Sequence, residues 1–125
     1  MTRTEKFVER IKKEILGKQY ELSFAFVSEN KIKALNKIYR KKNKATDVLS
    51  FPISKNSGEI LICKTAAKEK SKNFLDPATN SPITFQNYLI FLVIHGALHL
   101  KGLNHGVKME RYELTHYGRH RCRHL

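Results

Sequence analysis

The sequence has no tryptophan, only three prolines and six glycines, and two cysteines among its 125 residues. Cys63 and Cys122 are too few and too far apart for a disulfide framework, which favours a reducing compartment and a cytoplasmic location. No proline-rich or glycine-rich linker, internal repeat or low-complexity tract divides the chain. We therefore expect one domain over residues 1–125.

Long apolar runs are also missing. The longest, YLIFLVIHGALHL at residues 88–100, contains two histidines, and a membrane-spanning helix needs about 20 apolar residues. The N-terminal segment carries charges throughout and has no apolar signal-peptide region. A membrane protein is therefore disfavoured, and the apolar run is typical of a buried core helix.

Acidic residues are scarce. The chain has 11 Asp and Glu against 24 Lys and Arg, which gives a formal net charge of +13. Such an excess favours a polyanionic partner, above all nucleic acid, because Lys and Arg that neutralise phosphates release counterions. An anionic membrane surface is disfavoured, because no segment joins a basic face to a continuous apolar one. The alternative is that the lysines only keep the protein soluble.

The spacing of apolar residues indicates the order of the elements. A helical period predicts helices at about residues 3–16, 29–40, 65–73, 83–101 and 107–121. Alternating or continuous apolar residues predict strands at about residues 20–28, 46–53 and 58–64. This order indicates an α+β fold, one small sheet with helices packed on it.

Three histidines close together suggest a metal site. In HGALHLKGLNHG, residues 95–106, His95 and His99 are four positions apart and so lie on one face of a helix. Gly102 can adopt the left-handed conformation that ends a helix, which allows the chain to bring His105 back to the same point. Three imidazoles with an open fourth position are how proteins hold a catalytic zinc ion. We expect a metal site at the end of the buried apolar helix, and the alternative is three unrelated histidines.

The same histidine spacing occurs in metzincin peptidases, which carry a glutamate general base directly after the first histidine. Here that position is Gly96, which disfavours peptide hydrolysis. A second series, His116, His120 and His124, lies beside Cys122 and is crowded by arginines whose charge opposes a bound cation. We expect a basic helix end there rather than a second metal site.

A basic cluster lies in YRKKNKATDVLSFP, residues 39–52. The guanidinium of Arg40 can hold a phosphate by two hydrogen bonds and stabilise negative charge that develops on it. Lys41, Lys42 and Lys44 would attract a nucleic-acid backbone. Composition alone favours the alternative, a solvated helix end where cations complement the helix dipole.

The motifs RKKNKATDVLSFP, GEILI and HGALHLKGLNHG, in this order and at this spacing, resemble the YbeY family of bacterial endoribonucleases. The resemblance covers roughly residues 20–115, and MERYE at residues 109–113 resembles the helix that follows the histidine motif in the family. It implies a mixed sheet flanked by helices and action on RNA. It also implies a role in ribosomal RNA maturation, such as processing of the 16S rRNA 3′ end, and in ribosome quality control.

The resemblance further implies site residues. His95, His99 and His105 would bind one zinc ion per chain, and Arg40 matches the arginine that the family needs for activity. Two departures occur beside the third histidine, where Asn104 replaces the family's usual Asp and Leu103 its usual Tyr. If that Asp orients a metal ligand, Asn104 carries no charge there and the metal affinity would be lower.

Three functions follow as hypotheses. The first is a metal-dependent endoribonuclease that hydrolyses single-stranded RNA, because a reactive backbone must enter a pocket. The second is a ribosome-associated or RNA-binding accessory module with a structural zinc, for which a fourth ligand such as Cys122 or His116 would be evidence. The third is a metal-dependent peptidase-like hydrolase. Another divalent metal, such as nickel, is compatible with three imidazoles.

Overall fold

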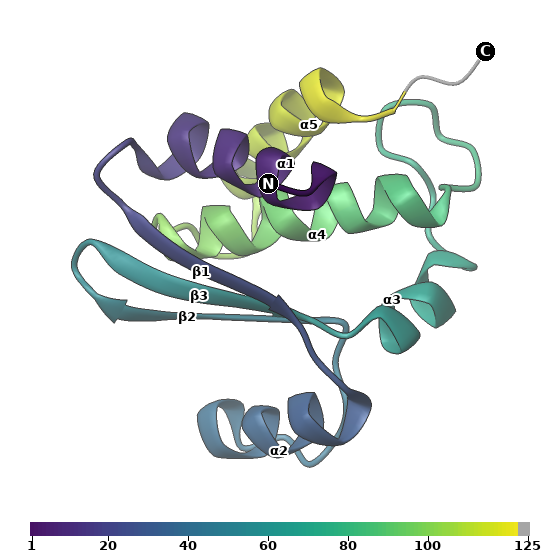
Figure 1. Ribbon diagram of the computed structural model, residues 1–125. Helices are drawn as coiled ribbons and strands as arrows, with labels where there is room; N and C mark the ends of the chain where they lie inside the picture. The colour runs from purple at the N-terminus through teal and green to yellow at the C-terminus, as the bar shows by residue number, and fades with distance from the viewer. Residues whose placement is uncertain (123–125) are drawn as a thin grey trace.

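The computed structural model describes residues 1–122, in which helices cover both faces of a three-stranded sheet (Figure 1). Each expected helix and strand is present, with its ends shifted by no more than two residues. The elements in chain order are α1 (Arg3–Ile11), the π-helical segment η1 (Lys12–Leu16), β1 (Glu21–Phe26), α2 (Glu29–Arg40), β2 (Val48–Ser54), β3 (Ser57–Ile62), α3 (Lys64–Ser71), α4 (Phe85–Leu100) and α5 (Val107–His120).

The sheet has the strand order β1-β3-β2, with β1 parallel and β2 antiparallel to β3. β2 and β3 form a hairpin, whereas the parallel pairing of β1 with β3 requires the intervening α2 and β2 to connect them. The sheet is therefore mixed, and the α+β fold expected from the sequence is confirmed. β2 is an edge strand, which leaves one of its sides without a neighbouring strand among the described residues.

Helix α4 is the centre of the main core. Nine of its 16 residues are buried, as expected for a helix that is apolar on all sides. In Figure 1, α4 lies on the face of the sheet opposite α2, with α1 and α5 beside it. The side chain of Thr84 accepts a hydrogen bond from the backbone N–H of Asn87 and so caps the N-terminus of α4. No helix within residues 1–122 has both the length and the apolar character to cross a membrane.

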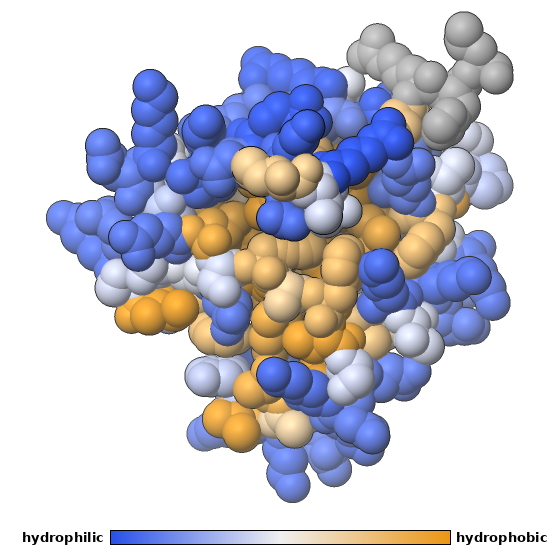
Figure 2. All heavy atoms as spheres, in the orientation of Figure 1, coloured by the Kyte–Doolittle hydropathy of each residue, from blue (hydrophilic) through white to orange (hydrophobic). Residues whose placement is uncertain are grey.

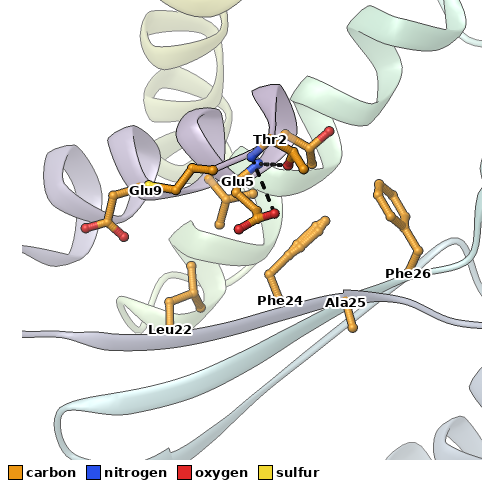
Figure 3. Close-up of a pocket in the computed structure, with 10 residues that line it drawn as sticks. Thr2, Glu5, Glu9, Leu22, Phe24, Ala25 and Phe26 are labelled. Atoms are coloured by element: carbon orange, nitrogen blue, oxygen red, sulfur yellow. Dashed lines mark hydrogen bonds between the residues drawn. The ribbon is translucent and has the colours of Figure 1, made fainter.

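Strand β1 alternates as its sequence predicts. Leu22, Phe24 and Phe26 point toward α1, and Ala25 points to the other side of the sheet (Figure 3). Between β1 and α1 lies a groove of about 570 Å³, and apolar side chains gather around the centre of this face of the molecule (Figure 2). The groove contains no histidine, arginine or lysine, so it is not the candidate site.

Two buried tyrosine–aspartate hydrogen bonds fix helices α4 and α5. The Tyr88 hydroxyl of α4 donates to Asp47, just before β2, at 2.5 Å, and the Tyr117 hydroxyl of α5 donates to Asp76 at 2.6 Å. Burial, together with the neighbouring carboxylate, raises the pKa of both tyrosines far above the ordinary value. Both hydroxyls therefore stay protonated and keep donating.

We expect Asp47→Ala to lower the free energy of unfolding by about 1–3 kcal/mol, because the buried Tyr88 hydroxyl would lose its acceptor. Urea denaturation followed by circular dichroism measures the loss. Tyr88→Phe is the matched control, and the double variant should be less destabilised than the sum of the two single variants. Strictly additive losses would show that this hydrogen bond does not hold α4.

Candidate metal centre

Three histidines converge at the C-terminal end of α4. His95 and His99 lie on its last turns, and His105 lies in the loop that follows. Each ring offers one nitrogen, and the three nitrogens lie within 4.8 Å of one another. His95 Nε2 and His99 Nε2 are 3.1 Å apart. Among the described residues these three form the one group of His, Cys, Asp or Glu side chains able to hold a metal ion.

The turn after α4 returns the chain to the site as the sequence predicts. Gly102 has a φ of 104°, a conformation that residues with a Cβ rarely adopt. Its N–H donates to the His99 carbonyl at 2.9 Å, and the Leu103 N–H donates to the Leu98 carbonyl at 3.1 Å. These bonds satisfy carbonyl groups at the end of the helix, as in other left-handed helix ends.

Both helical histidines are held through Nδ1. His99 Nδ1 donates to the Leu103 carbonyl at 3.1 Å, and His95 Nδ1 is 2.6 Å from a Glu113 carboxylate oxygen. A hydrogen bond at Nδ1 fixes the ring orientation and leaves Nε2 free to bind a metal. The two Nε2 atoms face each other, so the donor set is already oriented toward one point.

Glu113 is the residue at the histidine cluster that sequence reasoning missed. It lies on α5 and is 9% exposed, and its carboxylate contacts His95. Asn104, where the orienting carboxylate was expected, is exposed, and within residues 1–122 its side chain makes no hydrogen bond. One signal was available, because Met109, Glu113 and Tyr117 are spaced four apart on one helix face, which puts a charged residue within a buried apolar stripe.

The electrostatics of the cluster favour a neutral imidazole. Burial lowers the pKa of His99, and the nearby His95, His105 and Arg40 lower it further, while the hydrogen bond to the Leu103 carbonyl acts in the opposite direction. Neutral imidazole is the form that binds metals. Three nitrogen donors suit a transition metal such as zinc, whereas calcium and magnesium prefer oxygen. The residues present therefore fit a bound transition-metal ion.

Gly96 packs closely on the side chain of Ile60 in β3. A Cβ at this position would lie 3.1 Å from Ile60 Cδ1, which is tighter than ordinary van der Waals contact. The position faces β3, so a glutamate side chain there would point at the sheet and crowd Ile60. This agrees with the expectation that the metzincin type of peptide hydrolysis is disfavoured.

Arg40 is the last residue of α2 and is exposed, and its charge acts on His99. Lys41 follows with a left-handed φ of 58° and ends the helix. Lys42 and Lys44 are exposed in the loop before β2. The structure thus places an exposed basic segment at the end of α2, and the roles predicted for its residues stay predictions.

The second histidine series serves a different contact. His116 and His120 both bond to the carboxylate of Glu14 in η1, and the Cys122 N–H donates to the Asn87 side chain near the start of α4. Burial acts to raise the pKa of Glu14, but the hydrogen bonds and charges of the two histidines outweigh it and lower the pKa. Neither His116 nor Cys122 joins the three-histidine group, and His124 lies outside the described residues.

The fold and the site define an α+β protein of the class in which three histidines at the end of a helix can hold one metal ion. The family described as Endoribonuclease YbeY matches residues 1–124. This chain therefore belongs to the endoribonuclease YbeY family, as the sequence motifs indicated.

Individual relatives of this chain carry the same family name. A protein named Endoribonuclease YbeY from Thermotoga maritima is 38% identical over 103 residues, covering 81% of this chain and 63% of that protein. One of the same name from Staphylococcus epidermidis is 36% identical over 108 residues, covering 75% of this chain and 65% of that protein. The chain thus spans less than two thirds of the length of these relatives. The solution structure of TM1509 from Thermotoga maritima matches with a TM-score of 0.60 and 31% identity, covering 90% of this chain and 75% of that one.

We expect Glu113→Gln to weaken zinc binding by about 10- to 100-fold, because an amide holds the His95 ring less firmly and makes Nε2 a weaker donor. Competition with a chromophoric chelator measures the dissociation constant without any assay of activity. Glu110→Gln, an exposed position on the same helix, is the matched control and should bind zinc like the unaltered protein. Equal affinity of both variants would contradict a role for Glu113.

Proposed function

We propose that this chain is a metal-dependent endoribonuclease that hydrolyses phosphodiester bonds in single-stranded RNA. The observation that carries the proposal is the convergence of His95, His99 and His105 on one point in a member of a family of endoribonucleases. We assign one zinc ion per chain to this site, because zinc readily accepts three imidazoles and an open fourth position.

The chain's own residues have separate tasks. Glu113 and the Leu103 carbonyl hold His95 and His99 by Nδ1, which keeps the donor geometry fixed before a metal or substrate binds. A zinc ion, when bound, would supply Lewis acidity toward water or a phosphoryl oxygen. Arg40 would bind the scissile phosphate and stabilise the negative charge that builds on it.

The substrate we propose is ribosomal RNA, with maturation of the 16S rRNA 3′ end and ribosome quality control as the cellular roles. The relatives named as endoribonucleases support RNA, and the net charge of +13 supports a polyanionic partner. The ribosome or its proteins would then be the partners, and the cytoplasm the place of action.

The accessory-module hypothesis has less support. A structural zinc usually has four protein ligands, and neither candidate for a fourth ligand lies at the cluster. The His116 ring bonds to Glu14, and the Cys122 backbone N–H bonds to Asn87 near the start of α4. His105 is exposed, so the cluster is accessible from solvent. An accessible three-ligand site favours an enzyme.

The test is RNA cleavage by purified, metal-analysed protein beside His99→Ala and Arg40→Ala prepared identically. We expect about one zinc per chain and cleavage by the unaltered protein only, with a loss of at least about 100-fold in Arg40→Ala because it lacks the charge that stabilises the transition state. Arg10→Ala removes an exposed arginine from the last turn of α1 and is the matched control. It should cleave normally.

Two results would contradict the proposal. Equal cleavage by all the variants would identify a contaminating nuclease. Binding of zinc and RNA by the unaltered protein without cleavage would favour the accessory module.

Removal of the metal by a chelator should abolish cleavage, and added zinc should restore it.

The salt dependence of RNA binding should identify the lysines involved. We expect replacement of Lys41, Lys42 and Lys44 by alanine to reduce the slope of log K against log salt by roughly 2, because each phosphate contact on a single strand contributes about 0.7. Fluorescence anisotropy at several salt concentrations measures the slope. The control replaces three exposed lysines near the N-terminus, Lys6, Lys13 and Lys18, and an equal reduction there would show only a general charge effect.

A further inference from the structure

A stacked aromatic pair, one ring of which is exposed, lies next to Arg40. The rings of Tyr39 in α2 and Phe51 in β2 stack with their centroids 4.6 Å apart and their planes 13° from parallel. Phe51 is partly buried against the small core cluster of Ile32, Leu49 and Cys63, whereas Tyr39 is 55% exposed. The Tyr39 ring is therefore supported from one side by a packed ring, and much of its remaining surface faces solvent.

The strand register places this pair at the level of the histidine cluster. Along the β2–β3 hairpin, Ser50, Phe51 and Pro52 lie opposite Ile60, Glu59 and Gly58. On the other face of the sheet, Gly96 packs over Ile60, and the side chain of Leu100 lies against Gly58. His95 and His99 belong to this same part of α4, so the histidines and the aromatic pair lie at the same level of the β2–β3 hairpin, on opposite faces of the sheet.

The β2 edge between them is open. No strand of the described residues pairs with the outer side of β2, and α2 and α4 lie on opposite faces of the sheet (Figure 1). Arg40 directly follows Tyr39 as the last residue of α2. A strand of nucleic acid that crosses this edge can thus present a phosphate to Arg40 and the histidines and an adjacent base to Tyr39.

We propose that the exposed surface of Tyr39 is a stacking site for an unpaired nucleobase next to the bound phosphate. This inference rests on the proposed function and adds the means by which single strands are recognised. Every base has a π face that an aromatic ring can stack on, and bases in a duplex are already stacked on one another. The site would therefore select single-stranded RNA with little preference for its sequence.

The charges around the ring favour a nucleobase over an apolar protein surface. Arg40, Lys41, Lys42 and Lys44 follow Tyr39 within five residues and are all exposed. An apolar partner would have to cover these cations, whereas a nucleic acid neutralises them with the phosphates on either side of the stacked base. The simpler reading, in which Tyr39 only shields Phe51, predicts a loss of stability without any base-dependent effect.

The test measures binding of a metal-free protein to a single-stranded oligoadenylate by fluorescence anisotropy, which separates binding from cleavage. Tyr39→Leu should weaken binding by roughly 5- to 150-fold, the range for loss of one base stack, and Tyr39→Phe should bind like the unaltered protein. Tyr112→Leu is the matched control, because Tyr112 is a second exposed tyrosine, on α5. Thermal unfolding of each variant reports whether the fold is retained.

An abasic scan identifies the contact. When one base of the oligonucleotide is removed at each position in turn, we expect one position at which the unaltered protein and Tyr39→Leu bind equally. Double-stranded RNA of the same length should bind both proteins equally. Normal binding of the intact strand by folded Tyr39→Leu, or an equal loss at every abasic position, would overturn the stacking site.

The two proposals fail separately. If the protein cleaves RNA while Tyr39→Leu binds normally, the stacking site is wrong and the endoribonuclease stands. If cleavage is absent but Tyr39→Leu shows the base-dependent loss, the stacking site stands on an RNA-binding protein that is not a nuclease.

Discussion

The close packing of helix α4 on β3 positions the rest of the structure, and a glycine at residue 96 favours it. The absence of a Cβ lets the helix backbone approach the side chain of Ile60, and Gly58 gives Leu100 the same close approach one turn later. Close packing of this kind fixes the depth and rotation of a helix, because interiors tolerate neither gaps nor overlaps. With α4 fixed against the sheet, His95 and His99 lie at the level of the aromatic pair, on the opposite face of the β2–β3 hairpin. The position that carries the glutamate general base in metzincins is here a glycine, Gly96, which packs against the sheet.

Buried polar contacts then connect the remaining elements to α4. Tyr88 joins it to Asp47 before β2, and Glu113 joins His95 to α5. A hydrogen bond is stronger in a low-dielectric interior, and an unpaired polar group is correspondingly costly there. The buried carboxylate of Glu113 therefore specifies how α5 docks on α4, and it orients His95 at the same time. Helix α5 is as much a part of the candidate metal site as the helix that carries two of the ligands.

The parts of this structure that could be predicted from the sequence depend on neighbours in the chain. The helices, the strands and the convergence of three histidines follow from periodicity and from Gly102, because i and i+4 positions and a left-handed turn are local features. Glu113 is 18 residues from His95, and the stacked Tyr39 and Phe51 are separated by a loop and half a strand. Such contacts are set by how elements dock, which no local period encodes. The segment MERYE, residues 109–113, resembles the family and includes Glu113. The resemblance alone did not assign a role to this residue.

Asn104 takes no part in holding the histidines in this structure. Its side chain is exposed, and no hydrogen bond joins it to a histidine within the described residues. The orienting negative charge comes instead from Glu113, which is 9% exposed and acts where solvent screening is weak. A charge at Asn104 would be largely exposed to water and would contribute little to ring orientation. The carboxylate that contacts a ligand of the proposed metal site is that of Glu113, so we expect the metal affinity to depend on how firmly α5 is held. The buried hydrogen bond from Tyr117 to Asp76, one turn beyond Glu113, helps to fix α5 in place from outside the site.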